Sequence, residues 1–127
     1  SPQLRLFRST ITGNGVGIGL KYYSHLEVVG CTISENGLGI GLRHASQAEI
    51  IDNVIVGNST YGVAFGELGC FPDHPCTRIY AALGEGEFQG SVAGAGNTIQ
   101  GNLLAPVCPA ILEFLATEEG GAIDLSG

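Results

Sequence analysis

The feature that most constrains this chain is a repeat of 22 residues. The segment NGVGIGL begins at Asn14, and the nearly identical segment NGLGIGL begins at Asn36, 22 residues later. A fixed period of this length is typical of stacked units, each of which needs its neighbours to bury its apolar face. The repeat therefore predicts a solenoid in which successive coils build one core.

Steps of 22 residues also connect positions of the same chemical kind. The apolar columns are Leu4, Leu26 and Ala48; Leu6, Val28 and Ile50; and Ile11, Ile33 and Ile55. A step of 44 residues, which is two periods, leads from Ile55 to Ile99. The register is therefore expected to continue beyond an irregular stretch in the middle of the chain.

Within one coil the apolar residues alternate with glycine. Val16, Ile18 and Leu20 are separated by single glycines, and Leu38, Ile40 and Leu42 repeat this spacing. A period of two residues predicts β-strands with this apolar set on one face. A leucine-rich repeat would need a helical return, which the glycine, asparagine and β-branched residues disfavour. The solenoid is expected to be all-β.

Asparagines recur where the coils turn. Two columns are expected to form hydrogen-bonded ladders: Asn14, Asn36, Asn58 and Asn102, and then Asn53 and Asn97. Gly13, Gly15, Gly37 and Gly57 flank the first column, as expected where the chain turns with positive φ. Asn58-Ser59-Thr60 is also a glycosylation sequon, but its place in the column favours a ladder role over a glycan.

These turns resemble those of the right-handed parallel β-helix repeat family, the pectate-lyase-like solenoids. The resemblance is carried by DNVIVGN at 52–58 and GNTIQGN at 96–102, and it extends over residues 3–66 and 88–115. It implies an all-β, single-stranded right-handed parallel β-helix of about five coils of 22 residues with one irregular insertion. The handedness rests on the resemblance alone. Function does not follow, because this scaffold carries lyases, hydrolases, epimerases, adhesins and structural spikes.

The cysteines divide into two kinds. Cys31 shares a column with Ser9, Asn53 and Asn97, so it is interpreted as a small buried substitute for asparagine with a free thiol. Cys70, Cys76 and Cys108 are disulfide candidates, either as a pair that closes the loop between Cys70 and Cys76 or as one of these two joined to Cys108. A disulfide would favour an extracellular or cell-surface location.

The length of 127 residues predicts one domain. Its expected parts are regular coils at 3–66, an irregular insertion at 67–87, further coils at 88–115 and a tail or cap at 116–127. The insertion is either a structural flap or a site for a binding partner. Because position 1 is serine and the chain lacks methionine, Ser1 is interpreted as a cut end.

Charge and hydropathy exclude several partners. The net charge of −7 argues against nucleic acid, and no apolar run approaches the roughly 20 residues of a membrane span. No cysteine or histidine spacing predicts a metal site, and no motif predicts a cofactor. The expected partners are copies of the chain itself and, as an alternative, a glycan.

Two pairs of charged residues are the weak catalytic candidates. Glu27 and Glu49 share one column, and Lys21 and Arg43 share another, so each pair is expected on neighbouring coils about 4.8 Å apart. Stacked carboxylates could act as an acid and base pair or hold a cation, although solvated surface columns look the same. Candidate sugar-binding residues beside them are Tyr22, Tyr23, His25 and His44.

Three functions are compatible with these observations. The leading hypothesis is a secreted or surface-exposed structural solenoid without enzymatic activity, which assembles end to end into a filament through its open ends. The first alternative is a fragment of a polysaccharide lyase or glycosidase. The second alternative is a carbohydrate-binding or adhesive module.

Overall fold

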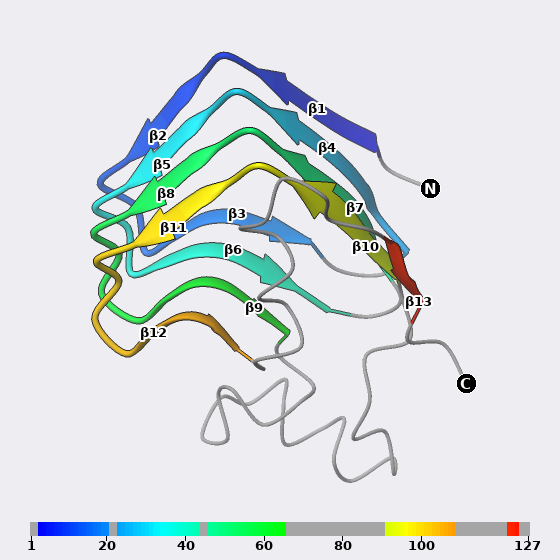
Figure 1. Cartoon of the computed structure of the whole chain (residues 1–127). Coiled ribbons are helices and arrows are strands. Elements are labelled where there is room, and N and C mark those ends of the chain that lie inside the picture. Colours follow the sequence, from blue (N-terminus) through cyan, green and yellow to red (C-terminus); the bar gives the residue numbers. More distant parts are fainter. Residues whose placement is uncertain (1–2, 21–22, 44–45, 66–90, 109–121, 125–127) are drawn as a thin grey trace, which may run out of the picture.

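A computed structural model describes residues 3–20, 23–43, 46–65, 91–108 and 122–124 of the chain. Within these ranges every regular element is a β-strand. The strands wind into four stacked coils, and each coil contributes one strand to each of three parallel sheets (Figure 1). The expected all-β parallel solenoid is thus confirmed.

Each sheet is built from every third strand. Sheet A contains β1 (Gln3–Phe7), β4 (His25–Val29), β7 (Gln47–Ile51) and β10 (Ser91–Ala95). Sheet B contains β2 (Thr10–Thr12), β5 (Thr32–Ser34), β8 (Val54–Val56) and β11 (Thr98–Gln100). Sheet C contains β3 (Val16–Leu20), β6 (Leu38–Leu42), β9 (Tyr61–Phe65) and β12 (Ala105–Cys108).

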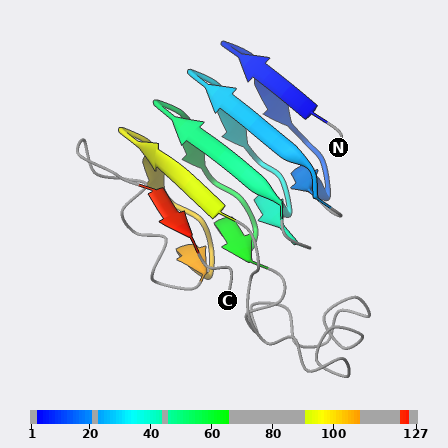
Figure 2. The ribbon, with the colours of Figure 1, turned by 90° about the vertical axis from the view of Figure 1, so that its right-hand side faces the viewer.

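A thirteenth strand breaks the pattern at the lower end of sheet A. β13 (Ala122–Asp124) pairs with β10 in the antiparallel direction, through three residue pairs. Figure 2 shows it beside β10 with the opposite direction. The antiparallel partner ends the parallel order of this sheet.

The register in sheets A and B follows the predicted period. Leu26 pairs with Ala48, and Ile33 pairs with Ile55, each 22 residues further along. Ile55 then pairs directly with Ile99. The third and fourth coils are therefore direct neighbours, although these two positions are two periods apart in the sequence.

Sheet C departs from the period by one residue. Ile40 pairs with Val63, which lies 23 residues later. The additional residue lies in the turn between Asn58 and Tyr61, because Asn36 and Asn58 are still 22 residues apart in their ladder. A single inserted residue is accommodated in a turn, where it does not reverse the faces of a strand.

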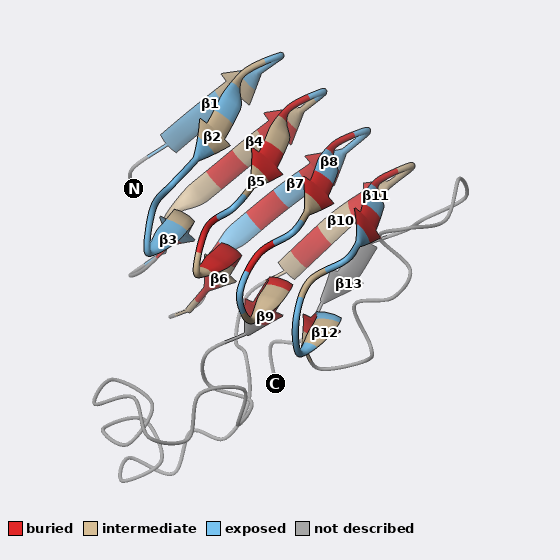
Figure 3. Cartoon of the chain, turned by 90° about the vertical axis from the view of Figure 1, so that its left-hand side faces the viewer, coloured by how far each residue is buried: buried red, intermediate tan, exposed pale blue. Residues whose placement is uncertain are grey.

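The core runs along the stack axis and is formed by the inward columns of all three sheets (Figure 3). Its fully buried side chains include Leu26, Val28, Ile33, Ile40, Leu42, Ile50, Ile55 and Val63. Because each coil covers the one before it, these side chains lose nearly all of their contact with water, which is the main stabilising contribution to such a stack.

The predicted alternation is wrong at Val16 and at its counterpart Leu38. Ile18 and Leu20 point into the core, but Val16 is 49% exposed. A Cβ placed on Gly19 would lie 3.6 Å from Val16 Cγ1, so Val16 shares the outer face with Gly19. The alternation is interrupted at Gly17, whose strand lies so close to the next coil that a Cβ would meet the Gly39 carbonyl oxygen at 2.7 Å.

The ladder of Asn14, Asn36, Asn58 and Asn102 ties the coils together at the turn between sheets B and C. The backbone N–H of Asn36 donates to Oδ1 of Asn58 at 3.0 Å, and Asn58 Nδ2 donates back to the Ile33 carbonyl oxygen at 3.4 Å. Asn58 is 1% exposed, so its amide is engaged in the ladder and is not available for a glycan.

A second ladder lies at the turn between sheets A and B. Asn53 Oδ1 accepts from the Cys31 backbone N–H at 2.9 Å, and Asn97 Oδ1 accepts from the Asn53 N–H at 2.9 Å. Cys31 is buried and free, and its Sγ takes the acceptor position opposite the Ser9 N–H at 3.5 Å. The interpretation of Cys31 as a small substitute for asparagine is consistent with this geometry.

Positive φ is found at a different set of turn residues than expected. Gly13 and Gly57 adopt it, but Gly15 and Gly37 do not. The column that requires it also contains Glu35 and Gly101. Gly37 is glycine for a steric reason instead, because a Cβ there would lie 2.5 Å from the Gly15 carbonyl oxygen of the coil above.

Candidate functional site

The outer face of sheet A carries the predicted carboxylate column. Glu27 of β4 pairs in register with Glu49 of β7, and Arg5 of β1 pairs with Glu27 on the other side. The Arg5 Nε lies 3.5 Å from Glu27 Oε2. An Arg–Glu pair at the exposed edge of a sheet contributes little to stability, because water screens both charges.

Arg5 was not among the residues predicted from the sequence, although the signal was present. A step of 22 residues back from Glu27 leads to position 5. In the structure Arg5 offsets one of the two carboxylates, so the column reads Arg5, Glu27, Glu49 and Ala93 from the top of the stack. The repulsion expected between the paired Glu27 and Glu49 is thereby partly offset by the charge of Arg5.

A small hollow of about 80 Å³ lies next to this column. It is lined by His25, Gln47, Ala48, Glu49, Ser91, Val92 and Ala93. His25 and Gln47 pair in register, and Gln47 also pairs with Ser91. An imidazole, an amide, a carboxylate and a hydroxyl on one face can hydrogen-bond a polyhydroxylated ligand.

The other predicted residues are not gathered at this hollow. Tyr23 is exposed in the turn that precedes β4 and has a positive φ of 62°. Arg43 follows β6 and lines a different depression. Lys21, Tyr22 and His44 lie outside the described residues.

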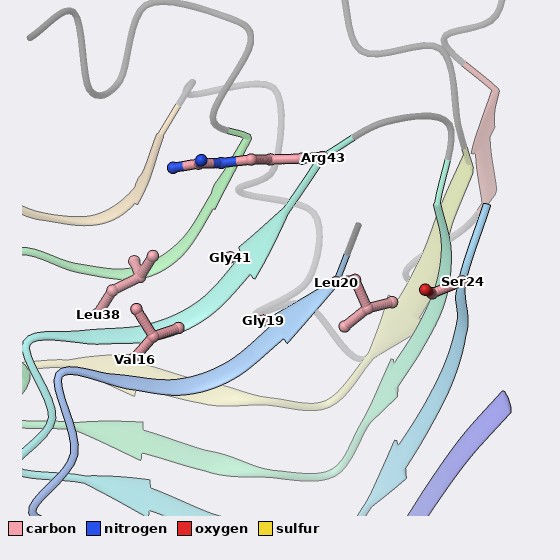
Figure 4. Close-up of a pocket in the computed structure, with 7 residues that line it drawn as sticks. All are labelled: Val16, Gly19, Leu20, Ser24, Leu38, Gly41 and Arg43. Carbon is pink, nitrogen blue, oxygen red and sulfur yellow. The ribbon is translucent and has the colours of Figure 1, made fainter. Parts of the chain in front are cut away.

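That second depression is a groove of about 480 Å³ on the outer face of sheet C. Figure 4 shows its lining residues, which are Val16, Gly19, Leu20, Ser24, Leu38, Gly41 and Arg43. Gly19 and Gly41 place no side chain over the floor of the groove, and Val16 and Leu38 form its apolar walls. The groove was not predicted from the sequence, because the alternation placed Val16 and Leu38 in the core.

The described ranges contain no candidate metal site of three or more ligands. They contain no group of three histidine, cysteine, aspartate or glutamate side chains placed to hold one. They also contain no helix that is long and apolar enough to cross a membrane.

The cysteines after Cys31 are only partly described. Cys108 at the end of β12 is half-buried. Cys70 and Cys76 lie outside the described residues, so the choice between the two predicted pairings stays open.

The geometry of the stack agrees with the comparison to protein families. The family model for the right-handed β-helix region matches residues 1–70, which is more than half of the chain. Comparison with curated proteins and with solved structures gives no match. With its three parallel sheets, two asparagine ladders and this family match, the chain belongs to the right-handed β-helix family.

Proposed function

We propose that this chain is a non-enzymatic structural solenoid of the cell surface or the extracellular space, which associates end to end with copies of itself. The observation that carries the proposal is the exposed core cross-section of the first coil. Leu4 is 44% exposed, whereas Leu26, at the same position one coil below, is completely buried. Leu6 and Ile11 are also only partly buried.

The backbone of the first coil supports the same proposal. β1, β2 and β3 are each the edge strand of their sheet, and Figure 3 shows how much more exposed this coil is than the coils below it. An edge strand with apolar side chains beside it favours the addition of another strand, because that strand satisfies the free N–H and C=O groups and covers the apolar surface. A disulfide at Cys108, one of the predicted candidates, would support a location in an oxidising environment.

Self-association is therefore expected to depend on Leu4. We expect the average mass of the wild-type chain in sedimentation velocity to rise with concentration, and Leu4→Lys to remain monomeric because a charge on the docking face must be desolvated. Val54→Lys is the matched control, since Val54 is 40% exposed but lies on the outer side of sheet B. A wild-type chain that stays monomeric at the highest soluble concentration would contradict the proposal.

Carbohydrate binding is the second candidate, favoured by the polar hollow beside Glu49. If it binds a sugar, the double variant Glu27→Gln and Glu49→Gln should lose binding on a glycan array while its thermal unfolding stays close to wild type. Release of shortened or unsaturated sugars by the wild-type chain would instead favour a lyase or glycosidase fragment that uses Glu27 and Glu49. Binding without turnover would favour an adhesive module.

A further inference from the structure

The hydrogen bonds of the first ladder have a direction. The backbone N–H of each ladder asparagine donates to Oδ1 in the next coil, at 3.0 Å for Asn14 to Asn36, Asn36 to Asn58 and Asn58 to Asn102. The two ends of the stack must therefore differ. Within the described ranges, Asn14 Oδ1 receives no hydrogen bond and the Asn102 backbone N–H makes none. The upper end offers an acceptor, and the lower end offers a donor in the same column.

The residues next to the two ladder ends also fit one another in size: large apolar side chains lie at the lower end and a glycine lies at the upper end. Beside Asn102 at the lower end, Leu103 is 78% exposed and Leu104 is 61% exposed. Beside Asn14 at the upper end is Gly15, and no atom lies within 4 Å of the position that a Cβ would occupy there. In the coil below, the equivalent Gly37 must be glycine because the Gly15 carbonyl oxygen lies against it. Among the residues that the structure describes, none imposes the same requirement on Gly15.

From these two ends we propose that a second copy stacks head to tail, with its Asn14 turn beneath the Asn102 turn of the first copy. This inference rests on the proposed self-association and names the two faces that meet. The Asn102 N–H would donate to Oδ1 of the second copy's Asn14. The second copy's Gly15 N–H would donate to the Asn102 carbonyl oxygen, as the Gly37 N–H donates to the Asn14 carbonyl oxygen at 2.8 Å.

The antiparallel β13 limits this stacking. It occupies the lower edge of sheet A, which is the place that β1 of the second copy would take (Figure 1). β13 is held to β10 by only three residue pairs, so its release is a local opening that leaves the four coils intact. Stacking and the release of β13 are therefore coupled, and Ile123→Pro, which removes a backbone N–H from β13, should strengthen association by about tenfold or more.

The test uses the full chain with one variant for each end. Gly15→Ala alters the upper face, and Leu103→Asp alters the lower face. Each variant alone should associate at least about tenfold more weakly than wild type, measured by sedimentation velocity. An equimolar mixture should form dimers, because the Leu103→Asp chain keeps an intact upper face and the Gly15→Ala chain keeps an intact lower face. Such rescue is a property of heterologous contacts.

Controls separate this contact from general loss of structure. Gly19→Ala places the alanine change on the outer face of β3, beside Val16, and Val54→Asp places the aspartate change on the outer side of sheet B. Neither side chain points toward the neighbouring copy, so both variants should associate like wild type. All four variants should unfold within a few degrees of wild type by circular dichroism.

The failures of the two proposals are distinguishable. If Leu103→Asp alone associates as strongly as wild type, the copies meet through another face, and the head-to-tail inference is wrong while self-association stands. The same conclusion follows if the mixture shows no rescue. If the wild type stays monomeric at every soluble concentration, the proposed self-association fails, and if Ile123→Pro does not associate either, the head-to-tail inference fails with it.

Discussion

Replacing Gly39 with alanine should lower the free energy of unfolding by about 3 kcal/mol, the upper range for forcing an extra carbon into a packed core. The added Cβ would overlap the Gly62 carbonyl oxygen of the next coil, and it would lie 3.1 Å from Ile55 Cγ2. Neither neighbour can rotate away, because one is backbone in the stack and the other is a fully buried core side chain. The coils would have to move apart, which strains both ladders.

Thermal unfolding followed by circular dichroism measures this effect. For a chain of this size the loss corresponds to a fall in Tm of roughly 10 °C. Gly19→Ala is the control, because a Cβ at Gly19 meets only Val16 Cγ1 at an ordinary distance of 3.6 Å. Similar melting temperatures for the two variants would mean that the coils separate easily, and the close stacking would then not be the source of stability.

Replacing Asn53 with alanine should be at least as damaging. Asn53 is 1% exposed, and its side chain makes three hydrogen bonds. These bonds satisfy the Cys31 N–H at 2.9 Å, the Val28 carbonyl oxygen at 3.1 Å and Asn97 Oδ1 at 2.9 Å. A buried donor or acceptor left without a partner costs about 1–3 kcal/mol, so the variant should lose about 4 kcal/mol.

The same column contains a matched variant with the opposite expectation. Cys31→Asn should unfold at the wild-type temperature or above it, because an amide oxygen would accept the Ser9 N–H better than the Sγ that now lies 3.5 Å away. Chemical denaturation of both variants would measure the difference. An equal loss of stability in Cys31→Asn and Asn53→Ala would show that side-chain volume at these positions matters more than the ladder bonds.

Much of the fold could be predicted because stacking converts a spacing along the chain into a contact in space. Residues 22 positions apart are neighbours in sheets A and B, so the columns of Leu26, Ile33 and Asn36 could be recognised from their spacing alone. The candidate site is less predictable. The pairing of Glu27 with Glu49 follows from the same spacing, but a column shows only which residues are adjacent and not whether they bind anything.

The sequence by itself determined the repeat, the apolar columns and the positions of the asparagine ladders, since each depends only on which residues meet one coil later. Only the tertiary structure decided on which face Val16 and Leu38 lie, because that depends on how closely Gly17 and Gly39 approach the next coil. It also decided that the tail pairs antiparallel with β10 through β13. The direction of a terminal strand depends on the path of the chain that leads to it, and no periodic pattern records that path.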